Sequence, residues 1–327
     1  MQPAKQHAFE FTGKGGEYFR IWIVNLLLSI VTLGIYSAWA KVRRLQYFYR
    51  NTRLDGASFE YHGMPIAILK GRLIAFVLFV LYTVAGNLNP LLGLVIFALI
   101  AVIMPWLIVR SLRFKLYNSS YRGLRFSFDG KTPAAYKVFL LFPILTVFTL
   151  YLLAPFTHQR IKQYQHNNSR FGDTAFRFDA TVGNFYGIYL VALGILLLAL
   201  VGTLFAVKLH LPFLALLVPL VYLYLIGHFA VNLPNLIWST TSLGPHTFHS
   251  NMQIGRYLWI GFTNLLGVVL TLGLFVPFAQ IRMARYRFAC LSLAAQGELG
   301  DFVAGQSQNA SATGEETAEM FDIDISL

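Results

Sequence analysis

Six long stretches without a single Asp, Glu, Lys or Arg constrain the fold of this chain more than any other feature. They cover residues 21–40, 73–109, 138–157, 180–207, 209–255 and 257–281. A helix needs about 20 mainly apolar residues to cross a hydrocarbon layer about 30 Å thick. Each stretch reaches or nearly reaches that length, and two are long enough for more than one crossing. The sequence therefore predicts a multi-pass integral membrane protein.

Turn signals divide the two longest stretches. Asn87-Leu88-Asn89-Pro90 interrupts one, and Lys208-Leu209-His210-Leu211-Pro212 interrupts the other. The result is seven hydrophobic segments, near 18–39, 66–86, 91–109, 135–156, 183–207, 212–233 and 255–279. The predicted fold class is an all-α polytopic membrane protein with about seven hydrophobic helical segments and short cytoplasmic β-strands between them.

Composition and charge support this prediction. The chain is 56% hydrophobic and 12% charged, whereas a soluble domain carries roughly a quarter charged residues. No Lys or Arg follows Arg287, and half of the 14 acidic residues lie after position 296. We expect a membrane domain over residues 1–295 and an acidic, disordered tail over residues 296–327.

Internal repetition is the second strong signal. An offset of 117 maps Phe9-Glu10-Phe11-Thr12-Gly13 onto Phe126-Ser127-Phe128-Asp129-Gly130, and an offset of 239 maps Thr32-Leu33-Gly34 onto Thr271-Leu272-Gly273. Matches at fixed offsets are the signature of a repeated unit. We predict three repeats, about 9–125, 126–247 and 248–295, in which segments 1, 4 and 7 are equivalent.

Short Phe-x-[Phe/Tyr] runs recur outside the hydrophobic segments, at Phe9, Phe59, Phe126 and Phe176. Alternation with polar residues and nearby glycines is typical of brief strands. We expect these four strands to pair into one small sheet outside the bilayer.

The basic residues leave two topologies open. Lys and Arg cluster after segments 1, 3, 4 and 7, and basic loops stay cytoplasmic. Seven plain spans would place the clusters after segments 1 and 4 on opposite sides. The favoured alternative makes segments 1, 4 and 7 bent or re-entrant helical pairs, broken near Thr32-Leu33-Gly34, Ala154-Pro155 and 273–277, because Pro and Gly break helices. Both termini are then cytoplasmic.

A family resemblance follows from the motifs of the first repeat. The stretches NLLLSIVTLGIYSAWAKVRR (25–44), YFYRNTRLDG (47–56) and FEYHG (59–63) resemble the YjgN-like family of bacterial inner-membrane proteins, a domain-of-unknown-function family. The resemblance extends over about 9–290, although Gly34 becomes Tyr151 and Trp39 becomes Phe156 and Phe278 in the other copies. It implies residence in the bacterial inner membrane and supplies no catalytic or ligand-binding residues.

Two groups of residues are candidate sites. Five intramembrane polar residues, which are functional candidates or helix-packing groups, are Asn25, His228, Asn232, Asn235 and Asn264. Basic and aromatic residues at helical spacing, typical of a membrane interface with anionic lipid headgroups, are Trp39, Lys41, Arg43, Arg44, Tyr47, Arg160, Tyr164, Arg282 and Tyr286.

No constellation for catalysis is evident, so we expect neither enzymatic activity nor a cofactor, metal or nucleic-acid partner. His246 and His249 have weak metal spacing without a carboxylate or cysteine nearby. The first hypothesis is transport or binding of a small or lipid-like solute between the repeats. The alternative is a membrane scaffold that uses a basic cytoplasmic face. Protein partners are not predictable from the sequence.

Overall fold

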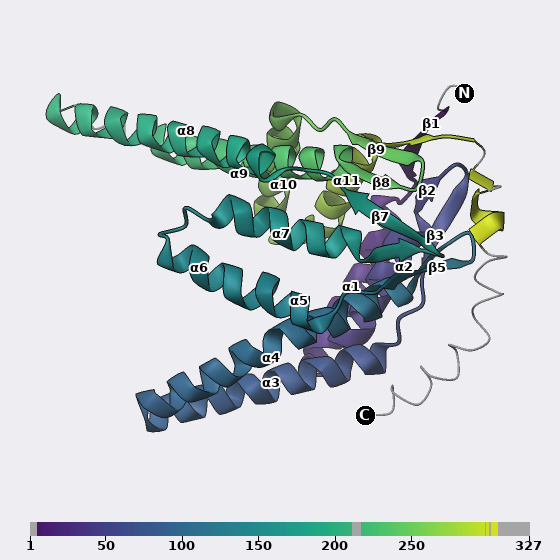
Figure 1. The fold of residues 1–327 in the computed structure, drawn as a ribbon, viewed down its shortest axis with the longest axis horizontal. Helices are drawn as coiled ribbons and strands as arrows, with labels where there is room; N and C mark the ends of the chain where they lie inside the picture. The colour runs from purple at the N-terminus through teal and green to yellow at the C-terminus, as the bar shows by residue number, and fades with distance from the viewer. Residues whose placement is uncertain (1–4, 211–216, 298, 301, 307–327) are drawn as a thin grey trace.

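A β-barrel forms one end of the molecule and helical hairpins project from it (Figure 1). The computed structural model describes residues 5–210, 217–297, 299–300 and 302–306. Ten antiparallel strands close the barrel in the order β1-β10-β9-β8-β7-β6-β5-β4-β3-β2. The strands are β1 (Lys5–Phe11), β2 (Thr52–Leu54), β3 (Ala57–Tyr61), β4 (Ser119–Tyr121), β5 (Leu124–Phe128), β6 (Ser169–Phe171), β7 (Thr174–Phe178), β8 (Thr241–Leu243), β9 (His246–Ser250) and β10 (Leu291–Ala295).

Every strand pairs with its neighbours in the chain, and β1 and β10 close the barrel. Ala8 pairs with Ser292 across this seam, and Phe9 pairs with Leu54 on the other side of β1. A closed barrel leaves no unpaired edge. Strands of three to seven residues are therefore stable here, although none would be stable alone.

The chain consists of five successive units, each with a strand, a helical hairpin and a second strand that pairs with the first. The helices are α1 (Gly15–Val31), α2 (Ser37–Arg50), α3 (Pro65–Leu88), α4 (Pro90–Tyr117), α5 (Thr132–Tyr136), the π-helical turn η1 (Lys137–Leu141), α6 (Phe142–Phe148), α7 (Ala154–Asn167), α8 (Val182–Lys208), α9 (Leu217–Ser239), α10 (Ile254–Leu270) and α11 (Val276–Ala289). Short hairpins in units one, three and five alternate with long hairpins in units two and four.

The short hairpins turn at the break that the sequence indicated. Thr32 ends α1, and its Oγ1 donates to the Leu28 carbonyl at 2.7 Å and accepts from the Tyr36 N–H at 2.9 Å. Thr271 makes the same two bonds, at 2.7 and 2.9 Å. The next residues, Leu33 and Leu272, have φ of 50° and 49°. Each hairpin therefore reverses at a side-chain bond that caps the first helix.

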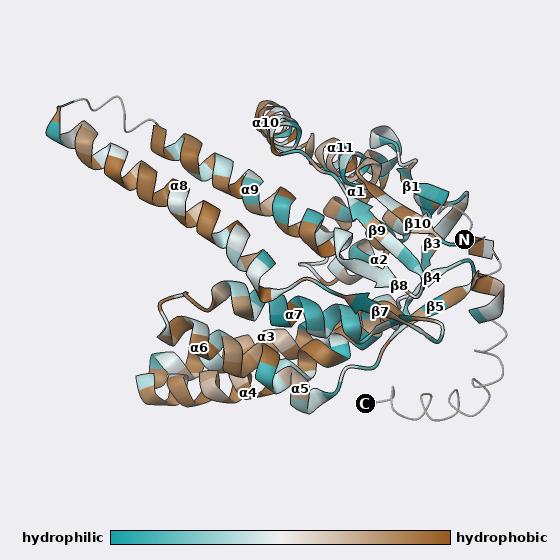
Figure 2. Ribbon diagram, turned by 45° about the horizontal axis from the view of Figure 1, so that its top comes forward, coloured by the Kyte–Doolittle hydropathy of each residue, from teal (hydrophilic) through white to brown (hydrophobic). Residues whose placement is uncertain are grey.

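The tips of the short hairpins are apolar and exposed. Leu33, Leu150 and Leu272 are 94%, 85% and 95% exposed. The returning helices are polar, as Figure 2 shows for α7. A short hairpin with an apolar tip and a polar return can enter a bilayer without crossing it.

Two long hairpins form the apolar arms of the molecule (Figure 2). Within the described residues, four helices are long and apolar enough to cross a membrane: Pro65–Leu88, Pro90–Tyr117, Val182–Ala206 and Leu217–Ser239. Asn89 caps α4, because its Oδ1 accepts the Leu91 N–H at 2.8 Å. The side chains of the arms face outward, where lipid replaces protein contacts.

This architecture corrects the predicted fold class. The chain is not an all-α protein with seven spans, because over the described residues helical hairpins alternate with strands that close a ten-stranded barrel, and four helices have spanning length. The topology in which segments 1, 4 and 7 each cross the membrane once is wrong. Each of these segments turns back after at most 17 helical residues.

The predicted four-stranded sheet is also wrong. The runs at Phe9, Phe59, Phe126 and Phe176 are strands β1, β3, β5 and β7, but none pairs with another of the four. Each lies between partners that the sequence pattern did not reveal, namely the three-residue strands β2, β4, β6 and β8 and, for β1, the five-residue strand β10. Three residues are too few to show alternation.

The beginning of the predicted disordered tail packs against the barrel. Leu299 and Val303 are buried in the core cluster inside the barrel, and Phe302 packs against it. The Gln306 side-chain oxygen accepts the Asp173 N–H at 2.8 Å. The rest of that predicted tail, residues 307–327, lies outside the described residues.

Candidate functional site

A closed ring of aromatic side chains lines the barrel. In each unit the first strand directs one phenylalanine inward, because side chains alternate between the two faces of a strand. Neighbouring ring centroids lie 4.8–6.4 Å apart, within the range of favourable aromatic pairing, along Phe9, Phe59, Tyr121, Phe171, Phe126, Phe176, Phe248 and back to Phe9.

The ring surrounds a chamber of about 570 Å³. Ligand pockets for small molecules have volumes of roughly 300–1,000 Å³ and mainly apolar walls with a few polar groups. The polar residues that line this chamber include Thr52, Ser119, Ser169 and His246. The hydroxyls of Ser119 and Ser169 donate to helix carbonyls at 2.8 and 2.7 Å. The walls of the chamber are therefore suited to an apolar ligand.

The helices build the floor of the chamber. The second helix of each hairpin ends at the barrel and contributes at least one large side chain at that end. These side chains are Phe48 and Tyr49 of α2, Lys115 and Leu116 of α4, His166 of α7, Trp238 of α9 and Phe288 of α11. Leu299, Phe302 and Val303 line the opposite end, where Phe302 lies 4.5 Å from His246 between ring centroids. The chamber thus lies between the membrane helices and the C-terminal residues that cover the barrel.

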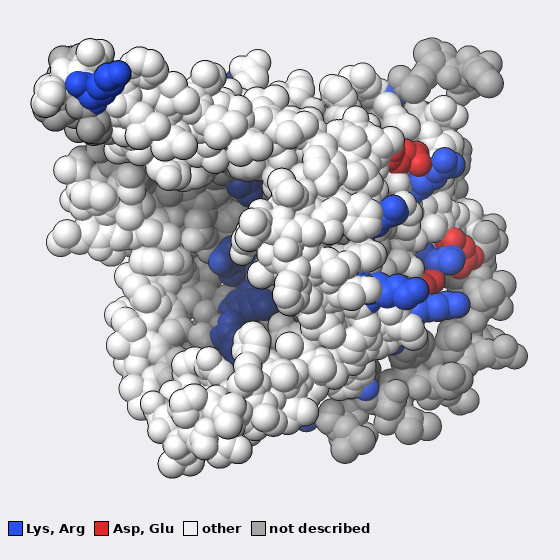
Figure 3. Space-filling view, turned by 60° about the vertical axis from the view of Figure 1, so that its left-hand side comes forward, with Lys and Arg blue, Asp and Glu red and all other residues white. Residues whose placement is uncertain are grey.

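A basic layer lies next to the floor. Arg44 is one helical turn before Phe48 and lies 6.0 Å from its ring, and Lys162 is one turn before His166. Lys115 lines the chamber itself. Figure 3 shows Lys and Arg side chains deep in the hollow between the helical arms.

Burial lowers the pKa of three basic groups near the chamber and so favours their neutral forms. Burial, with a smaller contribution from Lys162, lowers the pKa of His166 to about 4. Burial also lowers the pKa of Lys162, and the charge of Lys115 adds to this effect. His246 has a lowered pKa for the same main reason, together with the nearby His7. An apolar chamber favours neutral forms because desolvation penalises charge.

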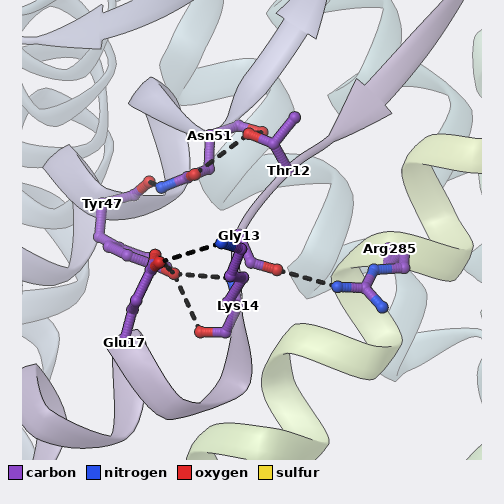
Figure 4. Close-up of polar contacts among 7 residues, drawn as sticks. All are labelled: Thr12, Gly13, Lys14, Glu17, Tyr47, Asn51 and Arg285. Atoms are coloured by element: carbon purple, nitrogen blue, oxygen red, sulfur yellow. Dashed lines mark hydrogen bonds and ion pairs between the residues drawn. The ribbon is translucent and has the colours of Figure 1, made fainter.

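Three predicted interface tyrosines hold the junctions between strand and helix. The hydroxyl of Tyr47 donates to the Lys14 carbonyl at 3.0 Å and accepts the Lys14 N–H at 2.8 Å (Figure 4). Tyr164 donates to the Lys131 carbonyl at 3.0 Å, and Tyr286 bonds both the N–H and the carbonyl of Gln253. Each bond spans 33 residues, from the start of a hairpin to its end.

The other predicted interface residues lie on the polar returning helices. Trp39 stacks on Tyr36 in unit one, and Arg43 lies 5.6 Å from the same ring. Lys41 is exposed on α2. Arg160 lies 5.0 Å from the Phe156 ring, and Arg282 donates to Asn264 at 2.7 Å.

Two of the predicted intramembrane polar residues, His228 and Asn264, make contacts between helices. His228 Nε2 lies 3.0 Å from the Ile188 carbonyl, and its Nδ1 lies 2.9 Å from the Asn232 amide. Asn235 donates to the Met252 carbonyl at 2.9 Å, and Asn264 donates to the Ala279 carbonyl at 3.2 Å. Asn25 is buried, with no partner for Oδ1 in the described part of the chain. None of the five lines the chamber.

Sequence reasoning missed the chamber residues. His166, Trp238 and Phe288 occupy equivalent positions near the ends of their helices. The offset of 117 relates unit one to unit three and unit two to unit four, and the offset of 239 relates unit one to unit five, but neither offset relates a short hairpin to a long one. Recognising long and short hairpins as one kind of unit would have revealed the pattern.

Comparison with known proteins places the chain in a family. Residues 6–320 match the family described as "Bacterial protein of unknown function (DUF898)". The chain belongs to this family. The predicted resemblance to YjgN-like proteins is confirmed, since similar relatives include "Inner membrane protein YjgN" of Salmonella typhimurium (strain LT2), 33% identical over 148 residues, and of Escherichia coli K12, 36% identical over 142 residues.

These alignments are partial. They cover 45% and 42% of this chain, and 38% and 35% of the two relatives. The chain therefore spans little more than a third of the length of the curated relatives it matches. No solved structure matches it. Family membership and four apolar helices establish a membrane protein whose relatives are named as inner-membrane proteins.

Proposed function

We propose that this protein is a non-enzymatic protein of the bacterial inner membrane that binds a small, lipid-like ligand in the barrel chamber. The observation that carries the proposal is the chamber itself, about 570 Å³ in volume and ringed by aromatic side chains. Its floor is made of the ends of the membrane helices, so a ligand from the bilayer could reach it through the hollow between the arms (Figure 3). We favour binding over transport across the bilayer because the chamber lies in the barrel rather than at mid-membrane.

We further propose that the barrel faces the cytoplasm. All five hairpins leave the barrel toward the same side (Figure 1), so the basic clusters after segments 1, 3, 4 and 7 share one side of the membrane. Basic residues are retained on the cytoplasmic side. Exposed residues such as Lys41 and Arg43 would then lie near anionic lipid headgroups.

The alternative is a scaffold that binds protein partners with its basic face. Charges outside the barrel are partly paired, as in Arg122 with Asp55 at 2.7 Å and Arg177 with Asp179 at 2.8 Å. A scaffold does not require a chamber, so the chamber favours ligand binding.

The test uses a diazirine-bearing fatty acid in membrane vesicles that contain the protein, with cross-linked peptides identified by mass spectrometry. We expect cross-links on the strands that line the chamber as well as on the lipid-facing arms. Leu293→Trp, which places a larger side chain in the chamber, should reduce the strand cross-links and leave those on the arms. Ser292→Trp, on the outer face of the same strand, is the matched control. Cross-links confined to the arms of the unmodified protein would refute the proposal.

A further inference from the structure

A second pocket lies between α10 and α11, away from the chamber. It has a volume of about 500 Å³. Its walls are Asn251, Gln253, Arg256, Ile260, Arg282, Arg285, Tyr286, Ala289 and Cys290. Three of the nine are arginines, and none of the lining residues that the structure describes is Asp or Glu.

Neutral partners hold the arginines in place. Arg282 donates to Asn264 Oδ1 at 2.7 Å and to Thr263 Oγ1 at 3.0 Å. Arg285 donates to the Gly13 carbonyl at 3.0 Å (Figure 4), and Arg256 lies 5.5 Å from the ring of Tyr286. Over the described part of the chain, none of the three arginines forms an ion pair. These contacts fix the guanidinium groups without neutralising their charge.

Two of the three arginine positions are uncharged or acidic in the equivalent short hairpins. The 239 and 117 offsets relate Arg256 to Glu17 and Ala134, and Arg285 to Gln46 and Gln163. Only Arg282 has arginine counterparts, Arg43 and Arg160. The same hairpin geometry forms in units one and three without the two extra arginines, so packing does not require them.

The pocket lies where the short hairpin of unit five meets the barrel. Arg256 is in the first turn of α10, and the following residues to Leu270 carry no charge. If the apolar part of α10 enters the bilayer from the barrel side, as proposed above, Arg256 would lie at the level of the lipid phosphate groups, where cationic side chains interact favourably with anionic lipid. Arginine suits such a ligand because its planar fork matches phosphate oxygens in a bidentate manner.

We infer that the pocket between α10 and α11 binds a phosphate group of net negative charge, carried either by an acidic lipid headgroup or by a soluble phosphate, in preference to the zwitterionic headgroup of phosphatidylcholine. The inference narrows the proposed contact with anionic lipid to one pocket. It does not depend on a ligand in the barrel chamber. Its test measures the reactivity of Cys290, whereas the test of the chamber measures cross-links on the strands.

The thiol of Cys290 can be used as a chemical probe of whether the pocket is occupied. It is the only cysteine of the chain and lines the pocket. The measurement is its alkylation rate by N-ethylmaleimide in nanodiscs of phosphatidylcholine, with and without phosphatidylglycerol, and in phosphatidylcholine nanodiscs with inorganic phosphate. A ligand that fills two thirds of the pockets should slow alkylation about threefold. Slowing by phosphatidylglycerol alone identifies a lipid headgroup, and slowing by both identifies phosphate in general.

Two variants test whether the arginines of the pocket are responsible for the protection of Cys290. The double variant Arg256→Glu and Arg285→Gln places the residues of unit one in the pocket, so the hairpin should still fold, and protection should disappear. Arg43→Gln removes a positive charge outside the pocket and should leave protection intact. The inference is overturned if neither phosphatidylglycerol nor phosphate slows alkylation, or if the double variant is protected as well as the unmodified protein.

Discussion

At the scale of single residues, hydroxyl groups define the short hairpins. Tyr47, Tyr164 and Tyr286 each bond the backbone where the first helix begins, while Thr32 and Thr271 bond the backbone where it ends. A hydrogen bond of this kind contributes about 1 kcal/mol net, and leaving a buried partner unsatisfied costs more. The hairpins are thus fixed at both ends by side chains that occupy equivalent positions.

Removing one of these hydroxyls should weaken the fold measurably. Tyr164→Phe deletes the bond to the Lys131 carbonyl and keeps the ring, so we expect a loss of about 1 kcal/mol in unfolding free energy. Thermal unfolding in detergent measures it. Tyr151→Phe, at an exposed hairpin tip, should have no effect. Equal effects of the two substitutions would show that the bond to Lys131 is not structural.

The neutral His166 makes stability depend on pH. Its pKa falls to about 4 in the folded protein, against about 6.5 for an unfolded chain. Its contribution is therefore fully present above about pH 6.5 and is lost as pH falls through about 4, because the unfolded state binds the proton more tightly. This pKa shift corresponds to a change of up to about 3 kcal/mol in the free energy of unfolding.

His166→Gln should therefore flatten the pH profile. Glutamine can still reach Thr241, whose hydroxyl lies 3.3 Å from His166 Nδ1, but it does not titrate. We expect the variant to lose less stability than the unmodified protein between pH 6.5 and 4, as measured by denaturant unfolding. The exposed His249→Gln is the control, and an unchanged slope in His166→Gln would contradict the assignment.

At the scale of elements, the five helical hairpins share one arrangement but occur in two lengths. Both kinds of hairpin leave one strand and return to the next. The arms have 23–28 residues per helix and the first short hairpin has 17 and 14. At 1.5 Å per residue, only the arms match a hydrocarbon layer about 30 Å thick. The polar return of each short hairpin further restricts how deeply it can enter.

The tips of the short hairpins should therefore sit within a single leaflet. Spin labels at Leu33→Cys, Leu150→Cys and Leu272→Cys, each in a Cys290→Ser background, should be accessible to oxygen and shielded from a water-soluble nickel complex. Asp173→Cys, on an exposed barrel turn, should show the reverse. A tip label that the nickel complex reaches as readily as Asp173→Cys would mean that the hairpin does not enter the bilayer.

At the scale of the whole molecule, ring closure determines the topology. Each hairpin must return to the barrel to deliver the next strand, so the chain returns to the same side of the membrane after every unit. The packing of Arg285 against Gly13 across the seam joins the first unit to the last (Figure 4). Opposite orientations for units one and three, which seven plain spans would require, are incompatible with this closure.

Cysteine accessibility in intact cells tests the proposed orientation. In a Cys290→Ser background, Asn87→Cys at the tip of an arm should react with a membrane-impermeant maleimide. Asp173→Cys should react only after the membrane is opened. Labelling of both from outside would show that the arms do not span, and labelling of Asp173→Cys alone would place the barrel in the periplasm.

The sequence by itself determined the membrane location, the family, the breaks in segments 1 and 7 and four of the strands, because long uncharged runs, Thr-Leu-Gly turns and Phe-x-[Phe/Tyr] alternation are local patterns. In segment 4 the predicted break at Ala154-Pro155 marks the start of α7, and the hairpin turns just before it, over residues 149–153. Tertiary structure alone decided the closed barrel, the seam between β1 and β10, and the chamber. The physical reason is that three-residue strands carry no periodic signal and become stable only when partners from other units pair with them. The chamber likewise exists only where five units bring their aromatic side chains together.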